Sequence, residues 1–414
     1  MPERPPIQGA MKKTDGPPLV PPTPVPAETV SLPDSAPTLL GRARSLSTAE
    51  ARARAEILVF FAVSRLLVLG SAAFVDLTGF PKPSAGSAFA HRPFALLEVW
   101  DGQWYRTVAT HGYLLLPGRQ SDPAFFPLLP ILLRLLHPLG LSYPTAGILV
   151  SNLAFGVGLL AFYELGRIWG PETIARRAAI YAAIFPMGFV FSMLYPEALA
   201  FAFIALAGLF AARRRWGRTA GFAALAVLAR PEGLLVIVPI CASAVRSWQT
   251  MPTASRGRAL AAVLAPVAAL IGYSGYLWWL LAEPFAWTKA QLAWGRSFHV
   301  TGIYGAVTEL SSALRHNDGW LFRDAAFCLV YLLCLVAAWR AGVPRAWIAA
   351  GAGMVLLPLT SGSFTSDARF GLLALPVYTG LAWIGRNRTV DVLIRIASIV
   401  LLVAGVETLL LHWP

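Results

Sequence analysis

A single acidic residue lies among aromatic rings in the stretch VWDGQWYRTVATHGY, residues 99–113. Asp101 has Trp100, Trp104 and Tyr105 as near neighbours, and two interpretations fit this pattern. In the first, the rings form an interfacial aromatic belt and the acid is solvated, because Trp and Tyr gather at the level of lipid headgroups. In the second, the rings stack on the apolar faces of a sugar, and the carboxylate of Asp101 accepts the proton of a hydroxyl group as a general base.

The same stretch supplies two further candidates for a sugar-binding cleft, His111 and Tyr113. For His111 the alternative is a histidine that packs in a loop and is hydrogen-bonded there. Glu98 lies three residues before Asp101, and we expect it to be solvated rather than to assist the base. The stretch therefore predicts one catalytic carboxylate, with the aromatic residues and the histidine as substrate-binding groups.

Two short motifs, YPE at 195–197 and ARPEG at 229–233, each place a proline and an acid where a helix begins. Acids in a first turn complement the helix dipole, which gives Glu197 and Glu232 a purely structural alternative. Arg230, near the outer end of a predicted span, opposes the usual charge bias and requires an acidic residue or a phosphate as its partner. The predicted substrate-binding residues of the two motifs are Tyr195, Glu197, Arg230 and Glu232.

Three further basic residues are predicted on the same side of the membrane, namely Lys289, Arg296 and Arg369. Long basic side chains extend readily to lipid headgroups, which is one interpretation. The other is a clamp on the phosphate of a lipid-linked donor, for which the guanidinium group has the bidentate geometry. We predict the second role for these three residues.

The elements that position these residues are predicted to be membrane-spanning helices. The chain has 414 residues, 57% of them hydrophobic and 13% charged. Its apolar runs of roughly 17–25 residues have the length of a helix that crosses a bilayer, and they lack the alternation of a barrel strand. The net charge of +13 falls in short loops between these runs, which indicates membrane topology rather than a nucleic-acid partner. Neither a metal pattern nor a cofactor motif is predicted, and the sequence leaves a divalent metal requirement open.

The predicted fold class is therefore an all-α polytopic membrane protein. Eleven spans are predicted, at 57–76, 145–168, 176–194, 196–212, 219–229, 233–246, 259–282, 325–340, 346–361, 369–386 and 391–412. Eleven spans place the basic loops in the cytoplasm and all the polar motifs on the opposite side. The apolar stretch 125–140 is predicted to be interfacial or re-entrant within a large first outer loop, 77–144. The fifth and sixth spans are short, and a half-crossing pair is the alternative for them.

Residues 1–45 are rich in Pro, Ser and Thr and include PPLVPPTPVP at 17–26. Such a composition cannot bury a core and favours extended conformations, so a disordered cytoplasmic tail is predicted. Ser47 with Glu50 forms a capping-box pattern that would begin the first helix. The membrane domain is predicted over 46–414, with its first span retained as an anchor.

The motifs also occur in an order that resembles a known family. The order is WDGQWYRTVATHGY, AFFPLLPILLRLL (124–136), FPMGFVFSMLYPEALAFAF (185–203), AALAVLARPEGLL (223–235), AQLAWGR (290–296) and SDARFGLLALP (366–376). The chain thereby resembles the PIG-V-like mannosyltransferases of the GT-C glycosyltransferase superfamily, whose eukaryotic members add the second mannose to GPI anchors. Family members often have Ser before the acid of YPE, and TRPTG in place of ARPEG. The abundance of Ala, Arg, Gly and Pro is typical of a high-GC bacterium such as an actinobacterium.

This resemblance implies a GT-C bundle in the cell membrane, with its active site on the extracellular or periplasmic face and Asp101 as the catalytic residue. It implies transfer of mannose from a polyprenyl-phosphate-mannose donor to a hydroxyl of a glycolipid or glycan. Another lipid-linked sugar or a protein acceptor is an alternative within the same fold. A transporter of lipid-linked sugars or a non-catalytic scaffold is the alternative from a different class, although a transporter is expected to carry ionisable groups in mid-membrane.

Overall fold

The structure is a computed structural model that describes residues 39–78, 94–297, 299, 301–316 and 319–409. The chain divides into two compact units, Met1–Thr48 and Ala49–Pro414, and the second holds all the predicted site residues. The predicted tail lies outside the described residues up to residue 38. Helix α1 (Leu39–Thr78) begins inside that tail and before the predicted capping box, because 39–46 contains no proline to interrupt a helix.

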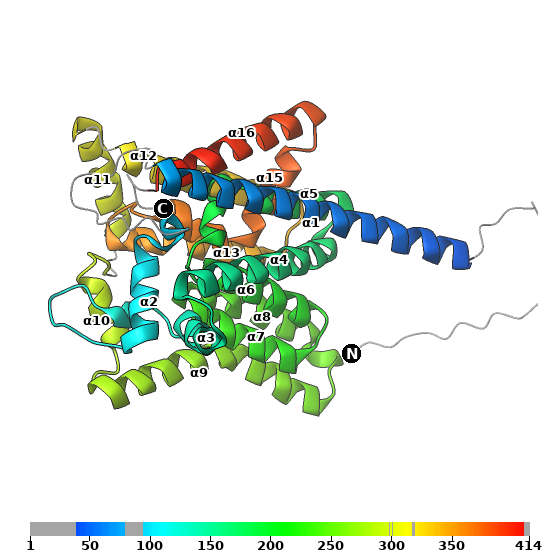
Figure 1. Ribbon diagram of the computed structural model, residues 1–414. Coiled ribbons are helices and arrows are strands. Elements are labelled where there is room, and N and C mark those ends of the chain that lie inside the picture. Colours follow the sequence, from blue (N-terminus) through cyan, green and yellow to red (C-terminus); the bar gives the residue numbers. More distant parts are fainter. Residues whose placement is uncertain (1–38, 79–93, 298, 300, 317–318, 410–414) are drawn as a thin grey trace, which may run out of the picture. The chain divides into compact units, whose positions relative to one another are not determined.

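The described part of the chain is helical and contains no strand (Figure 1). After α1, the α-helices are α2 (Asp101–His111), α3 (Leu128–Leu136), α4 (Tyr143–Trp169), α5 (Glu172–Ala183), α6 (Glu197–Ala212), α7 (Trp216–Ala229), α8 (Ile237–Ser247), α9 (Thr253–Leu281), α10 (Ala286–Leu292), α11 (Gly302–His316), α12 (Gly319–Arg340), α13 (Arg345–Leu356), α14 (Asp367–Phe370), α15 (Leu375–Ile384) and α16 (Arg388–Glu407). The 3-10 helices are η1 (Ala95–Glu98), η2 (Asp122–Ala124), η3 (His137–Leu139), η4 (Pro186–Ser192), η5 (Pro231–Val236), η6 (Trp248–Thr250), η7 (Pro358–Ser361) and η8 (Gly371–Leu373).

Six helical segments of the described residues are long and apolar enough to cross a membrane. They are Thr48–Thr78, Tyr143–Trp169, Pro231–Thr250, Thr253–Leu281, Gly319–Arg340 and Arg388–Glu407. A seventh span is possible if α5 and η4, which meet at a bend of 70°, count as one. These helices support a membrane protein, but the predicted number of eleven spans is not confirmed.

The predicted spans without a long helix are broken by proline or by charge. Helices α6, α7, α13 and α15 have only 16, 14, 12 and 10 residues. Three arginines, 213–215, separate α6 from α7. Pro231 and Pro358 begin new helical segments, and Pro376 lies in the first turn of α15. At a rise of 1.5 Å per residue, a helix of 14 residues is about 21 Å long, shorter than the hydrocarbon core of about 30 Å.

The stretch 125–140 contains one short helix followed by a 3-10 turn. Helix α3 has nine residues and continues into the 3-10 turn η3, which together are too short to cross a bilayer. The Nε of Arg134 donates a hydrogen bond to the carbonyl oxygen of Ala109 at 2.9 Å, which attaches α3 to α2. The predicted first outer loop thus contains two short packed helices, while its residues 79–93 lie outside the described part.

The bend between α5 and η4 is stabilised by a buried arginine of α1. The Nη1 of Arg65 donates to the carbonyl oxygen of Gly188 and to Oγ of Ser192, both at 2.9 Å, and Nη2 donates to the carbonyl of Ala183 at 3.2 Å. These three contacts attach the bend to α1. The bend thereby positions residues 193–197, which follow η4 and border the candidate site.

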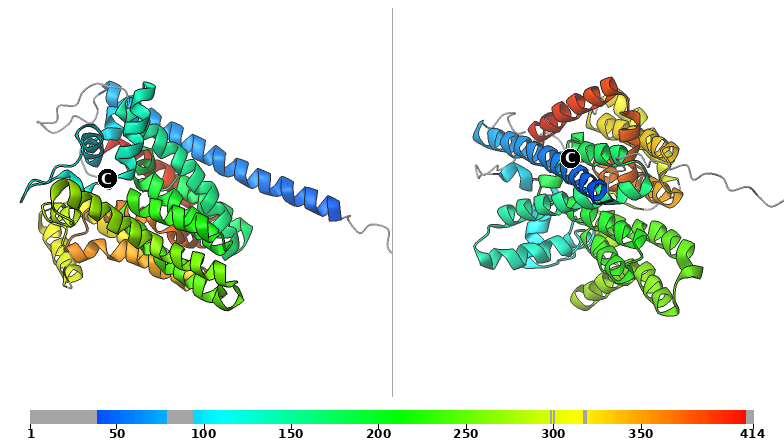
Figure 2. Two further views of the ribbon diagram at one scale, coloured as in Figure 1. Left: turned by 90° about the horizontal axis from the view of Figure 1, so that it is seen from below. Right: turned by 90° about the vertical axis from the view of Figure 1, so that its right-hand side faces the viewer.

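Close packing fixes the helices around that site. Helices α4, α6, α7 and α9 pack successively against one another, and α12 packs against α15. Figure 2 shows the same helices from two further directions. A side chain at Gly380 of α15 would lie 1.8 Å from the carbonyl oxygen of Cys334 of α12, so only glycine permits this approach.

Candidate functional site

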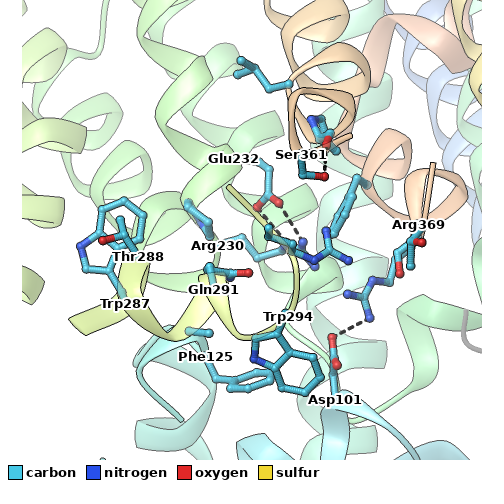
Figure 3. Close-up of a pocket in the computed structure, with 18 of the residues that line it drawn as sticks. Asp101, Phe125, Arg230, Glu232, Trp287, Thr288, Gln291, Trp294, Ser361 and Arg369 are labelled. Atoms are coloured by element: carbon cyan, nitrogen blue, oxygen red, sulfur yellow. Dashed lines mark hydrogen bonds and ion pairs between the residues drawn. The ribbon is translucent and has the colours of Figure 1, made fainter. Parts of the chain in front are cut away.

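The described residues line an open cavity of about 1010 Å³. Its walls come from the start of α2, from η2, η5 and α10, and from the segments around α13, η7 and α14 (Figure 3). The predicted site residues that line it are Trp100, Asp101, Tyr105, Arg230, Glu232, Arg296 and Arg369. Predicted site residues from four separate segments of the sequence therefore meet around one cavity.

Asp101 is the first residue of α2, and the backbone before it is strained. Trp100 has φ 61° and ψ −120°, in the left-handed half of the map that side chains rarely adopt. Two hydrogen bonds stabilise this conformation. The Nε1 of Trp100 donates to the carbonyl of Leu409 at 2.9 Å, and the backbone N–H of Asp101 donates to the hydroxyl of Tyr195 at 3.2 Å. The strain directs the carboxylate of Asp101 into the cavity, where its side chain is 19% exposed.

A chain of ion pairs leads from Asp101 into the protein. The Nη1 of Arg369 lies 2.7 Å from Oδ2 of Asp101, and its Nε lies 3.3 Å from Oε1 of Glu197. Glu197 also pairs with Arg230, whose Nε and Nη2 donate to the two carboxylate oxygens of Glu232 at 3.0 and 2.9 Å. Figure 3 shows the two ends of the chain, with Arg369 directed at Asp101 and Arg230 at Glu232. Three carboxylates are thus held in place by two guanidinium groups.

Burial makes this chain of ion pairs rigid. Glu197 is fully buried, and the side chains of Arg230 and Arg369 are each 8% exposed. Removing one partner of such a pair leaves a charge without compensation in a place that water does not reach, at a cost of about 3–5 kcal/mol. Glu197 was predicted to bind substrate, but it does not line the cavity. The structure instead places it behind Arg230 and Arg369, where it holds both.

Tyr195 lies behind the cavity in the same way. Its ring is fully buried beneath the guanidinium group of Arg369, at 5.2 Å from the ring centroid. Its hydroxyl donates to the carbonyl oxygen of Val99 and accepts from the N–H of Asp101, both at 3.2 Å. Tyr195 therefore positions Asp101 rather than lining the space where a substrate would bind.

Arg296 is a cation of the cavity wall that forms no ion pair within the described residues. Its guanidinium group lies 4.6 Å from the ring centroid of Phe370. Burial, together with the positive charge of Arg369, lowers the pKa of Arg296 to about 10, which still leaves it charged at neutral pH. The carboxylates of the cavity wall are already paired with other arginines, so the positive charge of Arg296 can attract an anion.

Lys289, the other predicted phosphate-binding residue of this segment, lies outside the cavity lining. Lys289 of α10 is 56% exposed, pairs with Glu283 and does not line the cavity. Glu283 lies in the connection just before α10, so the pair satisfies the ammonium group locally. The prediction that Lys289 binds a donor phosphate is not supported by this placement.

The aromatic wall differs in part from the predicted one. Trp104 stacks on Phe125, with ring centroids 5.5 Å apart and planes inclined by 5°, and meets the edge of Trp294 at 5.5 Å. Phe125 and Trp294 line the cavity, as does Trp287, whereas Trp104 lies one layer behind them. The motifs FFPLLP and WTKAQLAWGR contain these rings, but their spacing alone does not say which of them face the cavity.

His111 and Tyr113 do not line the cavity either. His111 is exposed, and its Nδ1 lies 2.7 Å from Oγ1 of Thr110. The hydroxyl of Tyr113 donates to the carbonyl oxygen of Phe125 at 2.8 Å, and its ring packs against Tyr273. Tyr113 thus binds the backbone of Phe125 and lies outside the cavity lining, where the sequence had predicted it to bind substrate.

Glu98 was expected to be solvated, and this is wrong. Its side chain is only 9% exposed and forms an ion pair with Arg106, at 2.7 Å between Oε1 and Nη1. Eight residues separate the two groups in the sequence, because the turn at Trp100 folds η1 back onto α2. The pair stabilises the turn that presents Asp101.

Two buried acids that the sequence did not single out, Asp324 of α12 and Asp367, lie at the turn before Arg369. Ser366 has φ 64°, and its N–H donates to Oδ2 of Asp324, a fully buried residue of α12, at 2.6 Å. Asp367 is also fully buried, and burial raises the pKa of its carboxyl group to about 7. This turn begins α14 and thereby directs Arg369 towards Asp101.

Among the described residues, no group of three or more His, Cys, Asp and Glu side chains is arranged to hold a metal ion. Neither a protein-family model nor a curated protein sequence matches the chain.

Proposed function

We propose that the chain is an integral-membrane mannosyltransferase that transfers mannose from a polyprenyl-phosphate-mannose donor to a hydroxyl of a glycolipid or glycan. The observation that carries the proposal is the composition of one cavity of about 1010 Å³. It combines the carboxylate of Asp101, the cation of Arg296, and the rings of Phe125 and Trp294. These are the groups that a base, a phosphate site and a sugar-binding wall require.

The transfer forms one bond and breaks one at the anomeric carbon of the sugar. The acceptor oxygen attacks this carbon on the face opposite the phosphate, and the bond between the carbon and the phosphate oxygen breaks with its electron pair on that oxygen. The proton of the acceptor hydroxyl passes to Asp101, and the configuration at the anomeric carbon is inverted. A phosphate leaves as an anion, so the step needs no second carboxyl group as acid.

The ion pair with Arg369 agrees with this role of Asp101. It engages Oδ2 and leaves Oδ1 for the acceptor hydroxyl. Pairing with a cation weakens a carboxylate as a base, but the hydroxyl becomes acidic as its bond to the sugar forms. Arg369 therefore supports the proposal as an orienting group, while Arg296 would stabilise the charge of the departing phosphate.

The proposal includes a membrane arrangement. A GT-C bundle with eleven passes, a cytoplasmic N-terminus and the cavity on the extracellular or periplasmic side explains why the basic loops alternate with the polar motifs. A transferase on that side needs a donor that crosses the membrane on a lipid, because nucleotide sugars are made in the cytoplasm. The cavity also has apolar lining residues, including Leu234, Leu235 and Leu357, which suit the beginning of a prenyl chain.

The test compares Asp101→Asn with the wild-type chain. Both are purified and supplied with labelled polyprenyl-phosphate mannose, and transfer of label into extracted lipids and glycans is measured. Loss of a general base predicts a rate lower by about 10²–10⁴-fold. Glu172→Gln is the matched control, since it removes a carboxylate from the first turn of α5, outside the cavity lining. Equal transfer by Asp101→Asn and the control would refute Asp101 as the base, and absence of transfer by the wild-type chain would refute the proposed activity.

A further inference from the structure

A second hollow, of about 250 Å³, lies at the other end of α7 from the cavity. Arg230 caps the C-terminal end of α7 and lines the cavity, whereas Trp216 begins α7 and lines the hollow. The 14 residues of α7 separate the two by about 21 Å. The hollow is therefore a separate place on the molecule, and no role described above involves it.

Four arginines from two segments of the chain line this hollow. Arg214 and Arg215 precede α7, Arg218 lies in its first turn, and Arg258 lies in the second turn of α9. No acidic residue is among its lining residues. Like charges that share one concave site repel each other, and this repulsion is relieved when an anion binds between them.

The arginines of the hollow differ from those of neighbouring basic segments. Arg213, in the same run, lies 3.1 Å from Glu164, and Arg167 pairs with Glu50 at 2.5 Å. Within the described residues the four arginines of the hollow form no ion pair. Glu232 is the one acid between residues 213 and 258, and it is bound to Arg230 at the opposite end of α7. The described part of the chain thus shows no counter-charge at the hollow.

Membrane topology alone does not account for this arrangement. The charge bias of cytoplasmic loops requires basic residues on one side of the membrane, but it does not require them to surround one concave space. Here two segments about 40 residues apart contribute to the same lining. The first turn of α7 also borders the hollow, and the space at Gly217 is open. Neither α7 nor α9 has a side-chain cap at its N-terminus, so the positive ends of both helices add to the field of the guanidinium groups.

We infer that this hollow binds a phosphate-bearing anion between Arg215, Arg218 and Arg258. Guanidinium groups bind phosphate oxygens in bidentate geometry, which suits a site built from arginine rather than lysine. A volume of about 250 Å³ is below the range of roughly 300–1,000 Å³ that is usual for drug-sized ligands. The ligand is therefore a single phosphate group, carried either by the headgroup of an anionic membrane lipid or by a small soluble molecule.

The experiment uses the full-length chain in neutral detergent and measures two kinds of binding. In the first arm, equal amounts of phosphatidylglycerol and phosphatidylcholine are added, and retained lipid is counted by native mass spectrometry. In the second arm, the delipidated protein is titrated with inorganic phosphate, and the unfolding temperature is compared with that in sodium chloride of equal ionic strength. Preference for phosphatidylglycerol alone assigns the lipid headgroup, and stabilisation by phosphate alone assigns a soluble ligand.

Arg218→Gln combined with Arg258→Gln is expected to weaken the observed binding by about tenfold or more, since two charge-assisted contacts are lost. Arg246→Gln is the matched control, because it removes a positive charge from the last turn of α8 outside the hollow. If the double variant does not reach the unfolding temperature of the control, Arg258→Gln alone is used. Binding that is equal in variant and control, or absent from the wild-type chain in both arms, overturns the inference. Because no mannose transfer is measured, the outcome does not depend on the proposed function.

Discussion

Arg369→Lys tests whether the ion pairs behind Asp101 position the proposed base. The substitution keeps a positive charge but removes the fork that joins two carboxylates, at 2.7 Å to Asp101 and 3.3 Å to Glu197. An ammonium group on a single stem cannot bind both in this geometry. We expect it to stay with the fully buried Glu197 and to release Asp101, because Asp101 is 19% exposed and water can solvate its carboxylate.

The expected effect follows from the loss of one charge-assisted hydrogen bond. Such a bond contributes about 1.5–3 kcal/mol, which corresponds to a decrease in kcat of about 10- to 150-fold. The KM for the donor should change little, because Arg296 and the aromatic wall are retained. The unfolding temperature should also stay close to that of the wild-type chain, since the charge in the buried cluster is conserved.

The assay is transfer of labelled mannose, measured over a range of donor concentrations. Arg395→Lys is the control, because it makes the same change in an Arg–Asp pair of α16, 3.1 Å between Nε and Oδ1 of Asp391, outside the cavity lining. Arg369→Lys combined with Asp101→Asn should be no slower than Asp101→Asn alone, since both changes affect one group. A wild-type kcat in Arg369→Lys, or fully additive losses in the double variant, would contradict the positioning role.

Three further predictions concern stability, pH and substrate binding. Gly380→Ala should destabilise the fold by about 3 kcal/mol through overpacking against the carbonyl of Cys334. The control Gly272→Ala, with nothing within 4 Å of the added carbon, should not destabilise it. Thermal unfolding of both variants checks this prediction. Asp367→Asn should gain stability relative to the wild-type chain as pH rises from about 5 to about 8. Burial raises the pKa of Asp367 to about 7, whereas the unfolded carboxyl group loses its proton near pH 4, so wild-type stability falls over this interval; parallel unfolding curves for the two proteins would disprove it. Trp294→Ala should raise the KM for mannose donors more than it lowers kcat, and steady-state kinetics with two donor sugars would detect the opposite pattern.

The sequence predicted the helical class because hydropathy acts over whole segments. A run such as 143–169 leaves no backbone N–H or C=O group unpaired in the membrane when it is helical. The structure forms α4 over that range. Hydropathy did not predict where helices break. The predicted span 369–386 is charged only at its two ends, yet η8 and a new helix start at Leu375, next to Pro376, divide it into α14, η8 and α15. The number of spans was therefore the weakest part of the prediction.

For the candidate site, the sequence identified residue types better than roles. Arg230 was notable because an arginine near the outer end of a span needs a partner, and Asp101 because it lies among aromatic rings. In the structure both join one chain of ion pairs with Arg369. Glu197 was singled out as an acid at a helix start, but whether a group faces a cavity or lies behind it depends on long-range packing. The ion pair of Glu98 with Arg106 depends on a strained turn at Trp100, which no local propensity favours.

The balance of charge around the cavity indicates which step the site would favour. Asp101, Glu197 and Glu232 are matched by Arg230 and Arg369 together with Arg296, so the empty site is close to neutral. Because the carboxylates already have partners in the other two arginines, the charge of Arg296 is available to a ligand. A donor phosphate gains negative charge as its bond to the sugar breaks, so this attraction is stronger in the transition state than in the bound donor. Arg296→Gln should consequently lower kcat as well as raise the KM for the donor, whereas a cation that only recruits lipid would change KM alone.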